Sequence, residues 1–170
     1  EILDTYYENI GGKENFKALE GMKMTASLNQ QGMEIPLEIY QMSDGRQMTL
    51  VTIQGKEIKQ GVFDGETLWS TNFMTMKAEK SDAETTANFK LNTNDFPDSF
   101  MDYKDKGYTV ELMGTETVDG AEAYKVKLIK EPITVAGETI EDVSFYFFDT
   151  ENYVPIAMES PVHQGQMKGQ

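Results

Sequence analysis

The first ten residues place hydrophobic side chains at helical spacing. They fall on one face when the segment is drawn as a helix, and Gly11-Gly12 follows at the point where such a face would end. The pattern predicts a short amphipathic helix, and a second short helical segment is expected from Glu14 to Leu19. The residues of the first apolar face are Ile2, Leu3, Tyr6, Tyr7 and Ile10.

From Met22 the period of the pattern changes to two. Apolar and polar residues alternate over residues 22–29 and again over 33–40, and a short link containing Gly32 joins the two runs as in a hairpin. Pro36 favours an edge position or a bulge, because proline has no N–H to donate to a neighbouring strand. Further runs at 46–53, 57–63 and 67–74 follow glycine-containing turns, which predicts a series of antiparallel strands.

The middle of the chain returns to helical patterns. Residues 81–84 offer an N-cap and an acidic first turn for a helix that reaches about Phe89. Phe96, Phe100 and Tyr103 are spaced for one face of a second helical piece, with Pro97 in its first turn. Strands are then expected over 108–117, 123–129, 143–149 and 154–160.

Residues 143–148 differ from the other strands because both of their faces are apolar. Such a strand should be covered on both sides, and the predicted helices are the natural cover. The patterns together predict an α+β fold in which a strongly bent antiparallel sheet faces helices. Because no linker interrupts the sequence, a single domain over residues 1–170 is expected.

Charge and composition exclude several classes of function. The net charge of −14, with Arg46 as the single arginine, argues against nucleic acid as a partner and fits a solvated acidic surface. No cysteine is present, and the longest apolar run is far shorter than the roughly 20 residues of a transmembrane helix. The sequence starts at Glu1 without a methionine, as either a mature protein that has lost a targeting peptide or a trimmed chain does.

The residues that usually carry catalysis are scarce. His163 is the one histidine, and a solvated loop position near the end of the chain explains it. No nucleophile motif or glycine-rich phosphate loop is present, and the acidic stretch from Asn92 to Asp105 lacks the order of a calcium loop. We therefore expect no enzyme activity, no metal and no cofactor.

Methionine and aromatic residues are abundant, with 11 methionines, 9 phenylalanines and 8 tyrosines. Many of them occupy the apolar positions of the predicted strands. They can fill a core, which composition alone favours, or they can form an adaptable surface for flexible apolar ligands.

Three passages resemble bacterial outer-membrane lipoprotein-sorting proteins of the LolA-like family, especially those of Bacteroidetes type. The passages are residues 10–19, the Asp-Gly-x-x-Leu-Trp hairpin within 63–69, and residues 112–126 followed by 145–149 and 154–156. The resemblance implies an incomplete antiparallel barrel with a helical lid over an apolar cavity, which receives lipoprotein acyl chains or a related lipid. Such proteins usually continue with further strands after the point that corresponds to Gln170, so we expect a shortened chain or a more open sheet.

Strand parity and the resemblance together predict which residues would serve this cavity. The expected lining is Met24, Ala26, Leu28, Ile35, Leu37, Ile39, Trp69, Val126, Leu128, Phe145 and Phe147. The lid candidates are Leu3, Tyr6, Tyr7, Phe96 and Phe100. The family carries a latch arginine before its Asp-Gly hairpin, whereas Arg46 follows a turn. Arg46 is therefore a latch candidate with an ordinary surface arginine as the alternative.

The first hypothesis is a carrier or binding protein without catalysis, periplasmic or associated with the outer membrane of a Gram-negative bacterium. Its partners would be a lipid or lipoprotein acyl chains, and an envelope protein is a further candidate. The second hypothesis is a structural or interaction module of the envelope whose concave face is filled by its own side chains. A hydrolase is the third, since acidic residues are numerous, but no carboxylate pair stands out.

Overall fold

The computed structural model describes residues 1–30 and 32–161, which belong to two compact units. The central unit is Leu19–Ser99, and the terminal unit combines Glu1–Ala18 with the chain from Phe100 onward. Each unit has its own sheet and is described separately. The terminal unit is built from both ends of the chain, so the expectation of one domain over residues 1–170 stays a prediction.

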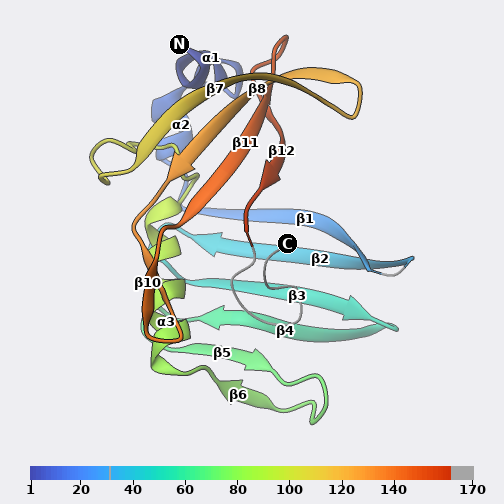
Figure 1. Cartoon of the computed structure of the whole chain (residues 1–170). Coiled ribbons are helices and arrows are strands. Elements are labelled where there is room, and N and C mark those ends of the chain that lie inside the picture. Colours follow the sequence, from blue (N-terminus) through green and yellow to red (C-terminus); the bar gives the residue numbers. More distant parts are fainter. Residues whose placement is uncertain (31, 162–170) are drawn as a thin grey trace. The chain divides into compact units, whose positions relative to one another are not determined.

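The central unit contains a six-stranded antiparallel sheet whose strands follow one another in sequence order (Figure 1). Tight turns make this arrangement possible, as at Gly45, whose φ of 90° suits glycine best. The predicted succession of hairpins is confirmed. The strands are β1 (Gly21–Gln30), β2 (Met33–Met42), β3 (Gln47–Ile53), β4 (Lys56–Phe63), β5 (Leu68–Thr71) and β6 (Ala78–Lys80).

Pro36 lies where the sequence predicted that a proline could be tolerated. It faces Ser27 of β1, while the pairing of β2 with β3 begins only at Leu37, opposite Val51. On its β3 side Pro36 is therefore at a local edge, and its missing N–H breaks no bond to that strand.

A bulge interrupts β4 at Gly61. Gln47 pairs with Phe63 and Thr49 pairs with Gln60, so an extra residue is inserted into β4. Gly61 has a φ of 57°, and the Phe89 ring lies 3.4 Å from where its Cβ would be. The bulge thus combines a left-handed backbone with close contact to a helix.

That helix is α3 (Ala83–Leu91), which runs along one end of the sheet and is followed by the short 3₁₀ helix η1 (Asn92–Asp95) (Figure 1). The Asp82 carboxylate accepts a hydrogen bond from the Thr85 N–H at 2.7 Å, which confirms the predicted N-cap. Phe89 packs edge-on against Phe63 of β4, with ring centroids 5.4 Å apart.

The terminal unit holds a four-stranded antiparallel sheet with strand order β12-β11-β8-β7 and a separate two-stranded hairpin, β9-β10. Two short helices from the start of the chain belong to this unit. The elements are α1 (Ile2–Asn9), α2 (Lys13–Lys17), β7 (Thr109–Val118), β8 (Ala121–Ile129), β9 (Ile133–Val135), β10 (Glu138–Ile140), β11 (Val143–Asp149) and β12 (Pro155–Glu159).

Helix α1 packs on one face of the four-stranded sheet. The Tyr6 ring packs edge-on against the Phe148 ring, with ring centroids 5.7 Å apart. Phe148 points to the same face of the sheet as the residue of β8 with which it pairs. This face forms the core of the unit. Its buried residues are Tyr6, Tyr7, Phe100, Met101, Tyr108, Val126, Leu128 and Phe148.

Strand β11 is covered on both faces, as its sequence predicted. Phe147 and Phe148 are neighbours that point to opposite faces, and they are 2% and 0% exposed. On the Phe147 face, the Lys125 Nζ lies 5.1 Å from the Phe145 ring centroid and 5.3 Å from that of Phe147.

The predicted helical piece through Phe96, Phe100 and Tyr103 is wrong. Phe96 adopts an extended conformation with ψ of 135°, which fits the steric demand of the proline that follows it. Residues 100–107 then form successive turns, and Asp102 has a φ of 50°. The α+β class and the unclosed antiparallel sheets are confirmed, whereas a lid over one apolar cavity remains a prediction.

Candidate ligand-binding site

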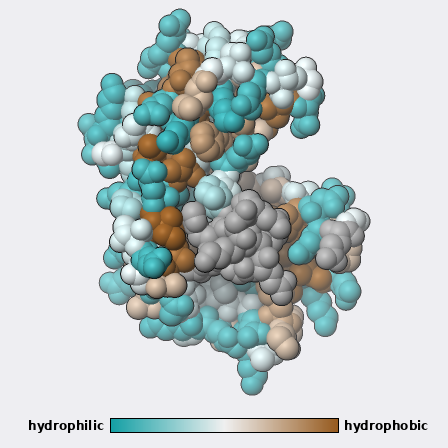
Figure 2. Space-filling model, viewed as in Figure 1, coloured by the Kyte–Doolittle hydropathy of each residue, from teal (hydrophilic) through white to brown (hydrophobic). Residues whose placement is uncertain are grey.

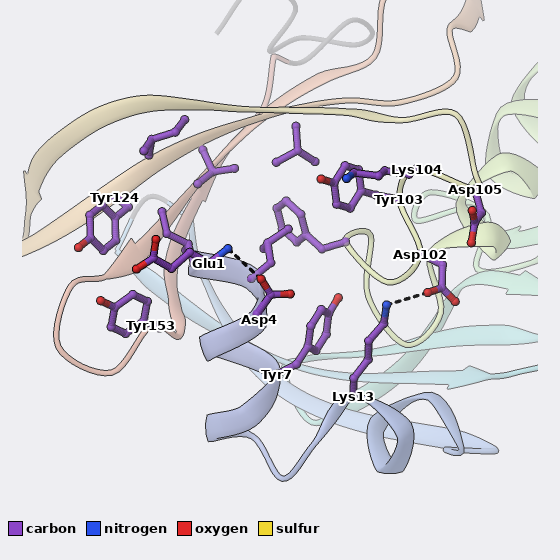
Figure 3. A pocket seen from close by; sticks show the side chains of 16 residues that line it. Glu1, Asp4, Tyr7, Lys13, Asp102, Tyr103, Lys104, Asp105, Tyr124 and Tyr153 are labelled. Carbon is purple, nitrogen blue, oxygen red and sulfur yellow. Dashed lines mark ion pairs between the residues drawn. The ribbon is translucent and has the colours of Figure 1, made fainter.

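A pocket of about 750 Å³ lies within the terminal unit, between α1, the turns at 100–105 and strands β7 and β8 (Figure 3). Its volume falls within the range of roughly 300–1,000 Å³ that small-molecule sites usually have. The pocket is the candidate site because it combines an apolar floor with a polar rim.

The floor comes from the face of the sheet that α1 covers. Leu112 of β7 pairs with Val126 of β8, and Val110 lies two residues before Leu112 on the same face. Leu3 of α1 and Phe100 complete the apolar part of the wall. Period-two alternation in the strands and the i, i+4 spacing of Leu3 and Tyr7 in the helix bring these side chains together.

One side of the rim is held by a charged cluster around Asp102. Its carboxylate contacts the Nζ of Lys13 at 2.9 Å and the Nζ of Lys17 at 2.5 Å. The hydrogen bond from Lys17, followed by that from Lys13, lowers the pKa of Asp102 to about 2. The two lysines are four residues apart on α2, so the short helix clamps the turn from one side.

The opposite side of the pocket carries Tyr124 and Tyr153, whose ring centroids are 5.7 Å apart (Figure 3). Hydrogen bonding of the Tyr124 hydroxyl, as donor, to Tyr153 stabilises its neutral form and raises the pKa of Tyr124. The turn before Tyr153 is tied to α1, since the Asn9 side-chain amide donates to the Asn152 carbonyl at 2.7 Å. The pocket therefore has hydroxyl groups at one end and an ion-pair cluster at the other.

The predicted cavity residues of the terminal unit do not share one surface. Val126 lines the pocket, and Leu128 lies on the same face of β8 but is fully buried in the core. Tyr146 of β11 pairs with Val126, so the adjacent Phe145 and Phe147 point to the opposite face. Their expected place beside Val126 and Leu128 is therefore wrong.

The other predicted lining residues belong to the central unit. Three directly opposed pairs join β1 to β2 and form an apolar stripe on one face of the six-stranded sheet. Trp69 is not on this face. Gln41 of β2 shares the face and pairs with Gln47, which pairs with Phe63, which in turn pairs with Leu68. Leu68 therefore lies on this face, and the adjacent Trp69 points to the opposite one. The pairs are Met24 with Ile39, Ala26 with Leu37, and Leu28 with Ile35.

The lid candidates have different positions. Leu3, Tyr7 and Phe100 line the pocket, and Tyr6 is buried in the core of the same unit. Phe96 lies in the extended segment after η1 and belongs to the central unit. Helix α1 thus covers the pocket, whereas the expected helix through Phe96 and Phe100 does not form in the described part of the chain.

Arg46 forms an ion pair within its own turn. Its Nε contacts the Asp44 carboxylate at 2.8 Å, and the Arg46 side chain is 57% exposed. The contact matches the ordinary surface arginine that was the alternative to a latch.

Sequence reasoning did not identify Lys13, Lys17, Asp102 or Tyr153 as site residues. The ion pairs join positions 85 or more residues apart, and nothing in the local pattern around Asp102 indicates them. The spacing of the two lysines was a usable signal, because lysines four residues apart share one helix face.

Apolar side chains also reach the surface of the central unit. Figure 2 shows hydrophobic residues at the surface over strands of the six-stranded sheet. At the β5–β6 turn, the Asn72 side chain accepts hydrogen bonds from the N–H groups of Met74 and Thr75, and Met74 is 95% exposed. These side chains are not part of the pocket.

Within residues 1–30 and 32–161, no group of three or more His, Cys, Asp or Glu side chains is placed to hold a metal ion. None of the helices in this part of the chain has the length and apolar character needed to cross a bilayer. His163 lies outside the described residues.

Comparisons with known proteins give structural similarity only. No protein-family model matches the sequence, and no curated protein matches it. A DUF1329 family protein from Desulfovibrio piger is similar with a TM-score of 0.45 and 14% identity, over 94% of this chain and 73% of its own. The Mycobacterium tuberculosis lipoprotein LppX is similar with a TM-score of 0.36 and 10% identity, over 87% of this chain and 82% of its own.

The chain is an α+β protein built on open antiparallel sheets. Its candidate site is the pocket that α1 covers in the terminal unit.

Proposed function

We propose that this protein binds a lipid-like molecule without transforming it, with the hydrocarbon part in the pocket beneath α1. The observation that carries the proposal is the composition of that pocket: an apolar floor of Val110, Leu112 and Val126, bounded by hydroxyl and charged groups at its rim. An amphipathic ligand would place its chain on the floor and its polar end at the rim.

The size of the pocket is sufficient for useful affinity. Each buried methylene contributes about 0.8 kcal/mol, so a chain of several methylenes binds without any specific polar contact. Binding of this kind needs no catalytic group. The proposal therefore includes the absence of enzyme activity. In line with the resemblance of the sequence to lipoprotein-sorting proteins, it also includes acyl chains as the ligand and the bacterial cell envelope as the location.

The test compares two tryptophan substitutions, one on each edge strand of the four-stranded sheet. Leu112 lines the pocket and is 60% exposed, whereas Met158 lies outside the pocket lining and is 55% exposed. Leu112→Trp should obstruct the pocket, and Met158→Trp is the matched control. With a fluorescent palmitate analogue as probe, we expect Leu112→Trp to weaken binding at least about tenfold, the equivalent of some two buried methylenes.

Met158→Trp should leave the affinity unchanged, and both variants should retain the unfolding midpoint of the parent protein within a few degrees. Mass spectrometry of an organic extract from denatured protein provides a second measurement. If the parent protein neither binds the probe nor yields a lipid, the proposal is wrong and the self-filled interaction module is the better hypothesis. Equal loss of binding in both variants would show that the probe does not use this pocket.

A further inference from the structure

Strand β1 is one edge of the six-stranded sheet, and it pairs with β2 alone among the described strands. It runs over ten residues, and all ten face β2 in one continuous register. Every residue from Lys23 to Gln30 is exposed. A long, regular strand of this kind presents a row of backbone N–H and C=O groups to which another strand can pair.

The other three edges of the two large sheets carry features that discourage such pairing. Strand β6 has three residues and includes Lys80, and β12 begins at Pro155 and meets a register shift in its pairing with β11. Strand β7 has a register shift between Leu112 and Gly114. Short length, proline, lysine and bulges are the usual protections of an edge.

Strand β1 has one of these protections, a single lysine, and lacks the others. It contains no proline, its pairing has no bulge, and Lys23 is its single charged residue, although 26% of the whole chain is charged. Lys23 is itself paired with Glu38 of β2 at 2.8 Å. The longest regular edge, β1, is thus protected by one ion-paired lysine alone, whereas β6, β7 and β12 are short, bulged or begin at a proline.

We propose that β1 is an interface for a second copy of this chain, which pairs its own β1 in the antiparallel direction about a two-fold axis at Ala26. The sequence of the strand is self-complementary in this register. Met24 would face Leu28 of the second copy, and Thr25 would face Ser27, so apolar residues meet apolar residues on one face of the joined sheet. Lys23 would face Asn29, and no like charges are opposed.

The overall charge of the chain predicts how dimerisation depends on salt. Each copy carries −14, whereas β1 carries no acidic residue, so two copies repel at long range but not at the contact. Salt reduces the repulsion because exposed charges are screened beyond about 8 Å at physiological ionic strength. Dimerisation should therefore strengthen as salt is added, and it does not depend on the pocket or on the proposed function.

Single cysteines test the register directly, because the chain has no cysteine of its own. In antiparallel strands, directly opposed Cα atoms are about 4.5–5.5 Å apart, which allows a disulfide. Ala26→Cys should thus form a covalent dimer under mild oxidation. Met24→Cys alone should not, since the two cysteines would be about four residues apart along the strands, roughly 13 Å. A mixture of Met24→Cys with Leu28→Cys should form the dimer again.

The matched control is Thr115→Cys on the β7 edge, which is also exposed and should remain monomeric. Sedimentation equilibrium of the full chain should show a dimer that Ala26→Lys weakens at least about tenfold, because two lysines would be opposed on the axis. A parent protein that stays monomeric at all concentrations and salt levels overturns the proposal. So does cross-linking of equal extent at positions 26, 24 and 115, which would indicate random collision.

Protection from hydrogen exchange, in a monomer, of the β1 amides that point away from β2 would also overturn it. That result would show that the edge is occupied by another part of the same polypeptide.

Discussion

Asp102 allows a quantitative prediction about the rim of the pocket. Its pKa is lowered from 3.8 to about 2 because Lys17 and Lys13 hydrogen-bond to its charged form. A shift of nearly two units corresponds to at most about 2.5 kcal/mol of stabilisation of the folded state. Asp102 is 26% exposed and both lysines are about half exposed, so solvent screening reduces the expected contribution to about 1 kcal/mol.

The direction of the pH dependence follows from the lowered pKa. The ionised carboxylate stabilises the folded state fully above the unfolded value near 3.8, and this stabilisation is lost as the pH falls through about 2. We therefore expect Asp102→Asn to lower the free energy of unfolding by about 1 kcal/mol at neutral pH. The difference between the variant and the parent protein should shrink between pH 4 and pH 2.

Urea denaturation followed by circular dichroism at several pH values measures this difference. Asp105→Asn is the control, since Asp105 lies in the same turn segment, lines the same pocket and is exposed. Comparison with the parent at each pH removes the contribution of the other carboxylates. The explanation would be refuted if Asp102→Asn were as stable as the parent at neutral pH, or if its deficit persisted unchanged to pH 2.

Three further predictions concern stability and use the same denaturation assay. Phe148→Ala should cost about 3–5 kcal/mol, because the side chain is 0% exposed at the centre of the terminal core; a cost below 1 kcal/mol would contradict that placement. Met74→Ser should change stability by less than about 0.5 kcal/mol, since Met74 is 95% exposed, and a large loss would show an unrecognised contact. Gly61→Ala should cost about 1 kcal/mol or more, because an added Cβ meets the Phe89 ring and a left-handed φ disfavours alanine; an unchanged midpoint would argue against the bulge.

The sequence was sufficient to predict most of the strands and the N-cap of α3. Period-two alternation is a local property, and it marked β1 and β2 and the doubly apolar β11. The Asp82 cap is equally local, because the hydrogen bond spans three residues.

Two errors came from single residues that interrupt a pattern. Pro97 was assigned to a first helical turn, but Phe96 before it is extended and no helix forms through Phe100. The bulge at Gly61 inserts a residue into β4, and the strands on the two sides of it no longer share one parity. This is why Trp69 was assigned to a face that Leu68 occupies.

The remaining differences depend on contacts between distant segments. Lys17 and Asp102 are 85 residues apart, and only the folded chain brings them together. The expected cavity lining mixed residues of the central sheet with residues of the terminal sheet, and alternation within a strand cannot tell which sheet a strand joins.

The terminal unit combines two distant segments of the chain, and this has a consequence for folding during synthesis. The central sheet is made of consecutive hairpins, so it can form as soon as residues 19–99 have left the ribosome. Helix α1 is made before the central sheet, but its partners Val126, Leu128 and Phe148 are made after it. The apolar face of α1 must therefore wait without its own sheet while more than 100 residues are added, which makes nascent α1 a segment that a chaperone would be expected to hold.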